Sequence, residues 1–243
     1  MYKRVVLCSL LGLAGIAQAT MKSTDHATGK YVYDLHEKTQ PKNNYTLALA
    51  PFAIDFSKNV PESLRDKFRN SLQAQITHML EMRGYSVLAS TLDKLNLEQK
   101  EKIFAVVDVS AFVDILEDTD MKLSKKHKEI EEDITDISAG FMRLKLIEPK
   151  SKNAFHMSSM ELPSYKVKTH VLVSQQRTSS GGFMPVSRTT VVRDEKFESN
   201  IDQILAKIYV KSVQKLAQDL LAQTFKPYEH LVENFKKNSP AQK

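Results

Sequence analysis

Residues 46–89 read TLALAPFAIDFSKNVPESLRDKFRNSLQAQITHMLEMRGYSVLA, and this stretch decides the fold. Residues 46–53 form a short apolar run, which is typical of a buried strand. From Leu64 to Leu80 a large apolar residue recurs at every fourth position. This spacing places the apolar residues in one stripe and predicts a long amphipathic helix.

Both ends of this helix carry recognisable signals. Pro61 suits the first turn, because the backbone N–H that proline lacks would have no partner there. Gly84 suits the end, because glycine adopts a left-handed backbone at little cost. Residues 85–89 then form a second predicted strand. The long crossover between the two strands favours parallel pairing.

The middle of the chain is predicted to consist mainly of strands. Residues 95–102 form a short polar helix, and the strands that follow are expected at residues 103–116, 139–148, 154–162 and 167–173. Residues 149–153, with one proline and small polar side chains, suit a hairpin connection. In the strand at 139–148, Phe141, Leu144 and Leu146 are apolar while Arg143 and Lys145 are polar, which predicts a sheet with one buried face.

A second long helix closes the chain. Residues 199–202 resemble a capping box, large apolar residues follow at helical spacing as far as Leu220, and Pro227 ends the helix. Two long amphipathic helices and at least five strands predict an α+β fold. We expect a mixed, largely antiparallel sheet with the two helices packed on one face.

The first nineteen residues have the features of an export signal. Lys3 and Arg4 precede an apolar run, and Ala17-Gln18-Ala19 is a small-x-small cleavage site. Cys8, the chain's one cysteine, lies early in the apolar run, so cleavage after Ala19 is expected rather than lipidation at Cys8. We therefore expect an exported protein of the periplasm, outer membrane or cell surface, with peripheral membrane association at most.

The remaining chain is predicted to form one domain. We expect a signal peptide at 1–19, a loose N-terminal arm at 20–45, a single α+β domain at 46–226 and a charged C-terminal tail at 227–243. Loss of the signal would lower the formal net charge of +6 by two. Acidic residues alternate with the basic ones, so no nucleic-acid partner is expected.

No pattern indicates catalysis. The seven histidines are scattered without a metal-ligand spacing, and no serine lies in a G-x-S-x-G turn. Gly181-Gly182 lies in a serine-rich loop without the context of a phosphate-binding motif. We therefore predict a non-enzymatic protein with no catalytic residue, metal site or cofactor.

Residues 117–136 are dense in charge and are predicted to form an exposed hairpin arm or a loop. Lys122, Lys125 and Lys126 lie among many acids. A basic run of this kind can bind the carboxylate of an acidic sugar through charge-assisted hydrogen bonds. The neighbouring acids offset that field, so a self-neutralising exposed arm is the alternative.

A further indication comes from the segment at 139–149, AGFMRLKLIEP, which resembles a hairpin of the neuraminyllactose-binding hemagglutinin family, the Helicobacter-type adhesin A. Supporting matches follow in the same order over residues 47–220: the segment 66–68 with its helix to Gly84, Gln99-Lys100, Ser180-Gly181-Gly182, and the helix from Ile201 to Leu216. The pattern is similar to that of a diverged paralogue of the adhesin.

The resemblance implies a surface or outer-membrane adhesin, associated with the flagellar sheath, that binds sialylated glycans on a host surface. The family's proposed sialic-acid motif is K-R-T-I-Q-K-K, and residues 120–126 occupy its place. Only Lys125 and Lys126 match that motif, while Asp120 and Met121 replace its two basic starting residues. Lys122, Lys125 and Lys126 are thus the predicted ligand-binding residues. The alternative function is an assembly module that docks an outer-membrane or sheath protein through the arm at 117–136.

Overall fold

The computed structural model describes residues 31–123, 129–177, 183–185 and 187–238. The signal peptide, Cys8 and residues 20–30 of the predicted N-terminal arm lie outside these residues, so they stay predictions, as do the domain boundaries. The strands are β1 (Thr46–Leu49), β2 (Ala53–Phe56), β3 (Ser86–Ala89), β4 (Ala105–Leu123), β5 (Glu129–Ile147), β6 (Ala154–Glu161), β7 (Lys166–Arg177) and β8 (Phe183–Pro185). The helices are α1 (Glu62–Met82), α2 (Leu97–Lys102), α3 (Ser187–Asp219), α4 (Ala222–Phe225) and α5 (Glu229–Asn238), with 3₁₀ turns η1 (Leu92–Lys94) and η2 (Lys226–Tyr228).

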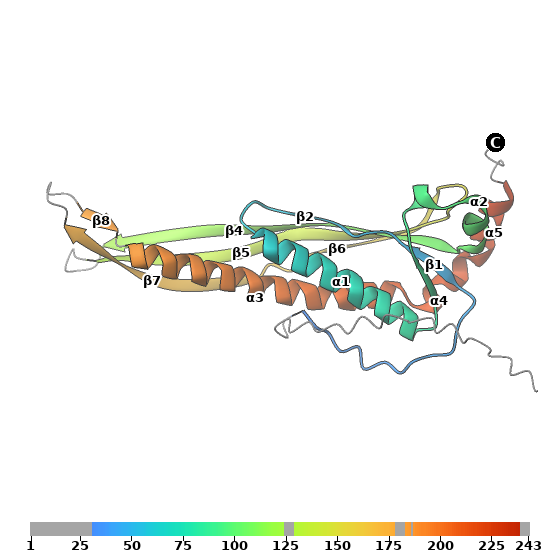
Figure 1. Ribbon diagram of the computed structural model, residues 1–243, viewed down its shortest axis with the longest axis horizontal. Coiled ribbons are helices and arrows are strands. Elements are labelled where there is room, and N and C mark those ends of the chain that lie inside the picture. The colour runs from blue at the N-terminus through green and yellow to red at the C-terminus, as the bar shows by residue number, and fades with distance from the viewer. Residues whose placement is uncertain (1–30, 124–128, 178–182, 186, 239–243) are drawn as a thin grey trace, which may run out of the picture.

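The molecule is elongated along two long central strands (Figure 1). β4 and β5, of 19 residues each, pair in antiparallel fashion over nearly their whole length. At about 3.3 Å per residue each strand spans about 60 Å. Residues 117–123 and 129–136 of the charged stretch therefore belong to the far part of this hairpin.

Shorter strands lie on both sides of the central pair. β1 and β2 pair in parallel with successive parts of β4, and β3 pairs in parallel with β1, as the predicted crossover requires. β6 and β7 pair in antiparallel fashion with successive parts of β5. The predicted α+β fold with a mixed, largely antiparallel sheet is confirmed.

The two long helices cover one face of the sheet, which we name the helix face (Figure 1). The predicted stripe of α1 is buried, and Phe68 packs edge-on against Tyr209 of α3 and against Tyr31. The opposite face, named the open face, carries the alternate side chains of β4 and β5. Within the described part of the chain, no helix has both the length and the apolar character needed to cross a membrane.

The chain between Tyr31 and β1 has no helix or strand but is held at defined points. The N–H of Gln40 donates to the carbonyl of Met82 at 2.7 Å, and the N–H of Asn43 donates to that of Gly84 at 2.8 Å. Gly84 has φ +80°, and a Cβ there would lie 2.0 Å from the carbonyl oxygen of Pro41. Glycine is therefore required where the arm crosses the end of α1.

The capping box expected at residues 199–202 is wrong, because α3 begins at Ser187 and these residues lie inside it. Asn200 faces the sheet instead, and its amide donates to Asp136 Oδ2 and to Thr169 Oγ1, both at 2.7 Å. Burial raises the pKa of Asp136, and the charge of Glu117 raises it further, whereas the Asn200 hydrogen bond lowers it. The side chain of Asn200 thus ties α3 to the sheet.

The predicted C-terminal tail contains a packed helix, α5. Val232 of α5 is buried in the main core together with Phe225 of α4, which lies just before the predicted tail. The ammonium of Lys236 donates to the carbonyl oxygens of Glu101 and Ile103, at 2.6 and 2.9 Å. Burial lowers the pKa of Lys236. α5 is therefore anchored beside α2 at the end of the molecule opposite the hairpin.

Candidate functional site

The predicted ligand-binding lysines belong to the far end of the β4–β5 hairpin. Lys122 is the last but one residue of β4 and pairs with Glu131 of β5. Lys125 and Lys126 lie outside the described residues. The assignment of these lysines to ligand binding therefore stays a prediction.

A second candidate lies on the open face, where two phenylalanines are exposed. Phe112 of β4 and Phe141 of β5 are direct cross-strand partners, with ring centroids 6.5 Å apart and ring planes 37° apart. Their exposed fractions are 38% and 47%. The aromatic pair forms an apolar platform on the middle of the sheet.

Gly140 shapes this platform. Its φ is +151°, and a Cβ there would lie 2.1 Å from the carbonyl oxygen of Phe112. Only glycine allows the two strands to lie this close at that point. The backbone between Ala139 and Phe141 is thus fitted to the neighbouring strand.

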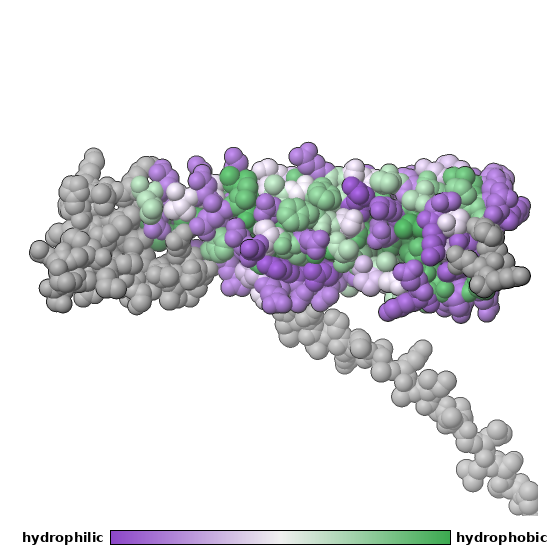
Figure 2. Space-filling view, turned by 90° about the horizontal axis from the view of Figure 1, so that it is seen from above, coloured by the Kyte–Doolittle hydropathy of each residue, from purple (hydrophilic) through white to green (hydrophobic). Residues whose placement is uncertain are grey.

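Two further apolar residues are exposed on the open face, away from the aromatic pair. Leu116, which pairs with Ile137, is 52% exposed, and Met157, which pairs with Lys145, is 59% exposed. Figure 2 shows that hydrophobic residues are exposed in patches between hydrophilic ones along the body. Clusters of exposed large apolar side chains of this kind commonly mark a binding surface.

Arg143 lies next to the platform. It is exposed, two positions from Phe141 on the same face, and pairs with Ser110 on one side and Ser159 on the other. Alternate residues of a strand are about 7 Å apart, so Arg143 and Phe141 are neighbours on the open face. Asp55 and Glu161 lie at the two ends of the Phe112–Phe141 row.

The other arginines with described side chains have partners inside the protein. Arg65 and Arg69 donate to carbonyl oxygens, and Arg83 donates to a carboxylate and to carbonyls. The guanidinium of Arg143 donates to none of the residues that the structure describes. It is therefore available to bind a ligand carboxylate in bidentate fashion.

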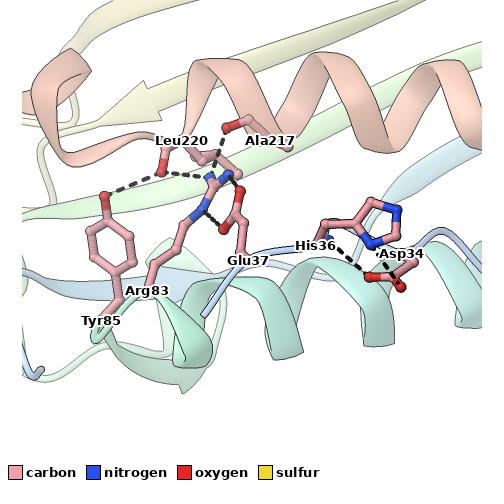
Figure 3. A network of polar contacts seen from close by, with 7 residues as sticks. All are labelled: Asp34, His36, Glu37, Arg83, Tyr85, Ala217 and Leu220. Carbon is pink, nitrogen blue, oxygen red and sulfur yellow. Dashed lines mark hydrogen bonds and ion pairs between the residues drawn. The ribbon is translucent and has the colours of Figure 1, made fainter. Parts of the chain in front are cut away.

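Arg83 shows what an engaged guanidinium looks like in this fold (Figure 3). Its Nε and Nη2 donate to the two carboxylate oxygens of Glu37, at 2.7 and 2.5 Å, and its Nη1 donates to the carbonyls of Ala217 and Leu220 near the end of α3. The Arg83 hydrogen bond lowers the pKa of Glu37. A cavity of about 490 Å³ beside it is lined by Tyr33, Leu35, Gln214, Gln218 and Leu221 as well. Because the protein itself occupies the donors of Arg83, we assign this network to stability.

The described residues contain no group of three or more potential metal ligands. Two histidines contact carboxylates, His36 with Asp34 at 3.1 Å and His170 with Asp133 at 2.7 Å. All four side chains are more than half exposed. Both histidine–carboxylate pairs are thus typical of surface contacts. The binding surface that remains is the open face, with its aromatic, hydroxyl, cationic and carboxylate groups.

Comparison with known proteins identifies the family. The family model described as neuraminyllactose-binding hemagglutinin precursor matches residues 14–239. The chain belongs to the neuraminyllactose-binding hemagglutinin family. The resemblance of the segment at 139–149 to this family is confirmed.

Relatives within this family are similar over most of their length. A neuraminyllactose-binding hemagglutinin of Helicobacter pylori is 22% identical over 229 residues, which cover 89% of this chain and 86% of the relative. Another from the same species is 22% identical over 242 residues, covering 94% and 91%. The crystal structure of a homolog of that hemagglutinin from Helicobacter pylori has a TM-score of 0.63 at 26% identity and covers 84% of this chain and 97% of that chain. Their names describe binding proteins.

The family segment at 139–149 contains Phe141 and Arg143, two residues of the open-face candidate that the sequence-based prediction did not name. Phe141 was expected on the buried face with Leu144 and Leu146, and this is wrong, since Met142, Leu144 and Leu146 are buried and Phe141 is exposed. The spacing along the strand indicates the correct face, because residues an odd number of positions apart on a strand lie on opposite faces. Phe141 therefore shares its face with Arg143 and Lys145, and not with Leu144 and Leu146.

Proposed function

We propose that this member of the hemagglutinin family is an exported, non-enzymatic adhesin-like protein that binds sialylated glycans on its open face. The observation that carries the proposal is the unengaged guanidinium of Arg143 beside the exposed Phe112–Phe141 pair. The names of the relatives supply the class of ligand, a neuraminyl sugar.

The chemistry of a sialylated glycan fits these groups. Its carboxylate accepts two parallel hydrogen bonds from Arg143, and such charge-assisted pairs are about twice as strong as neutral hydrogen bonds. Ser110 and Ser159 flank Arg143 and can exchange hydrogen bonds with sugar hydroxyls. The aliphatic C–H groups of a pyranose ring pack on the rings of Phe112 and Phe141.

The lysines of the hairpin are a separate contact in this proposal. Phe112 and Lys122 are ten residues apart on β4, which is about 33 Å in a strand. One sialic acid residue cannot reach both places. We propose Arg143 for the terminal sialic acid, and Lys122, Lys125 and Lys126 for more distant anionic groups of a host surface.

Titration of the mature protein with 3′-sialyllactose in a calorimeter tests the proposal. We expect saturable heat with sialyllactose and none with lactose, because lactose lacks the carboxylate. The variant with Lys122, Lys125 and Lys126 all changed to alanine should bind sialyllactose as the wild type does. Equal heats from both sugars, or no heat from either, would contradict the proposal.

Export is proposed on the features of residues 1–19 and has its own test. Expression of the full chain in its native cell, followed by fractionation and mass determination, should yield a protein that begins at Thr20 outside the cytoplasm. A mature protein that begins at a lipid-modified Cys8, or one that keeps Met1, would contradict this processing.

A further inference from the structure

Among the residues that the structure describes, neighbouring segments cover the outer edge of β4 as far as Ile115. β1 and β2 pair with its first part, up to Val113. The N–H of Ile115 then donates to Ser57 Oγ at 3.1 Å, and the Asn59 amide donates to the Ile115 carbonyl at 2.8 Å. Beyond this point, β5 is the one described strand that pairs with β4.

The backbone of the uncovered edge points outward in a regular pattern. The carbonyl of Val113 and both backbone groups of Ile115 face the β2 side. Outward groups alternate along an antiparallel strand, so those of Glu117, Thr119 and Met121 face the same way. An edge of this kind is a template for one further strand.

The side chains along the edge indicate what kind of strand fits. Glu117, Asp118 and Asp120 are exposed and acidic, and two exposed apolar residues, Leu116 (52%) and Met121 (64%), lie at the ends of the edge. A second copy of this edge would bring like charges together, which is unfavourable across paired strands. A strand that carries lysine or arginine instead lowers the net negative charge of this stretch.

We propose that residues 116–121 of β4 accept an extended, lysine- or arginine-rich segment of a partner protein as an additional strand. This gives the docking function expected for the arm at 117–136 a defined geometry. It is independent of the open face, because the added strand lies beside β4 and leaves Arg143 and the aromatic pair uncovered.

A synthetic peptide of eight alternating lysine and valine residues, labelled with a fluorophore, tests the proposal with the intact mature protein. We expect binding by anisotropy and slower hydrogen exchange at the backbone amides of Glu117, Thr119 and Met121. Thr119→Pro removes one outward N–H and no bond to β5, so the fold is expected to remain while affinity falls at least ten-fold. Thr119→Val is the matched control and should bind as the wild type does.

The charges are tested separately. Changing Asp118 and Asp120 together to asparagine should weaken peptide binding several-fold, and a peptide with glutamate in place of lysine should not bind. The proposal is overturned if the folded wild type does not bind the lysine peptide, if Thr119→Pro leaves its affinity unchanged, or if the protected amides lie elsewhere. Self-association of the protein through this edge would also overturn the choice of a basic partner. Sialyllactose binding by Thr119→Pro should be unchanged, so this test and that of the glycan site fail independently.

Discussion

Arg83→Met is expected to lower the free energy of unfolding by about 2–4 kcal/mol, because it removes a half-buried ion pair and leaves buried carbonyl acceptors without their donor. Arg83 is 6% exposed, and its guanidinium joins the N-terminal arm, the end of α1 and the end of α3. Methionine fills a similar volume but donates no hydrogen bond. The Glu37 carboxylate and the carbonyls of Ala217 and Leu220 would each lose a donor. Urea unfolding followed by circular dichroism measures the change.

The loss of stability in Arg83→Met should depend on pH. Because Arg83 lowers the pKa of Glu37, the ion pair stabilises the fold above the ordinary pKa of glutamate. That stabilisation is lost as the pH falls through the lowered pKa. The difference between wild type and Arg83→Met is therefore expected to be full at neutral pH and to shrink in acid.

Lys102→Met provides the matched control for Arg83→Met. Lys102 and Glu98 also form an ion pair, but their side chains are 70% and 75% exposed. Exposed pairs of this kind contribute little to stability. If both variants unfolded at the urea concentration of the wild type, the Arg83 network would have no structural role.

Arg143→Gln is expected to weaken the affinity for sialyllactose about 10- to 100-fold. A hydrogen bond to a charged group contributes about 1.5–3 kcal/mol, and glutamine supplies neither the charge nor the paired donors of a guanidinium. The side chain of Arg143 is exposed, so the fold should be unaffected. Calorimetric titration at constant ionic strength measures the affinity.

Lys145→Gln is the matched control, because Lys145 lies on the same strand and the same face, two residues further on. It removes the same charge without removing a guanidinium, and its effect should be much smaller. Phe141→Ala should weaken binding of the same sugar by loss of the aromatic platform. Equal losses in Arg143→Gln and Lys145→Gln would point to a diffuse charge effect instead of a specific contact.

Elements with a clear period could be predicted from the sequence. The four-residue spacing of α1, with Gly84 after it, gave the helix and its end, and the crossover between β1 and β3 followed from its length. The hairpin at 149–153 was also predicted, and the structure adds its reason. The buried carboxylate of Glu148 accepts the N–H groups of Lys150 and Ser151, at 3.1 and 2.6 Å.

Features that depend on distant residues could not be predicted in this way. Arg83 and Ala217 are 134 positions apart, and Asn200 and Asp136 are 64 apart, so no local pattern links either pair. The capping box was expected at residues 199–202 with Ser199 as the cap, but here the Asn200 amide meets a buried carboxylate on the sheet. The charge-rich run at 117–136 favoured its lysines as the ligand-binding residues. The aromatic platform depends on the face of the sheet on which Phe141 lies.

The most direct test of the central claim is the location of bound sialyllactose, measured by amide chemical-shift changes in the isotope-labelled mature protein. The proposal predicts the largest changes at Phe112, Phe141 and Arg143, with smaller ones at Ser110 and Ser159. Changes confined to residues 117–136, or to the helix face around Arg83, would contradict it.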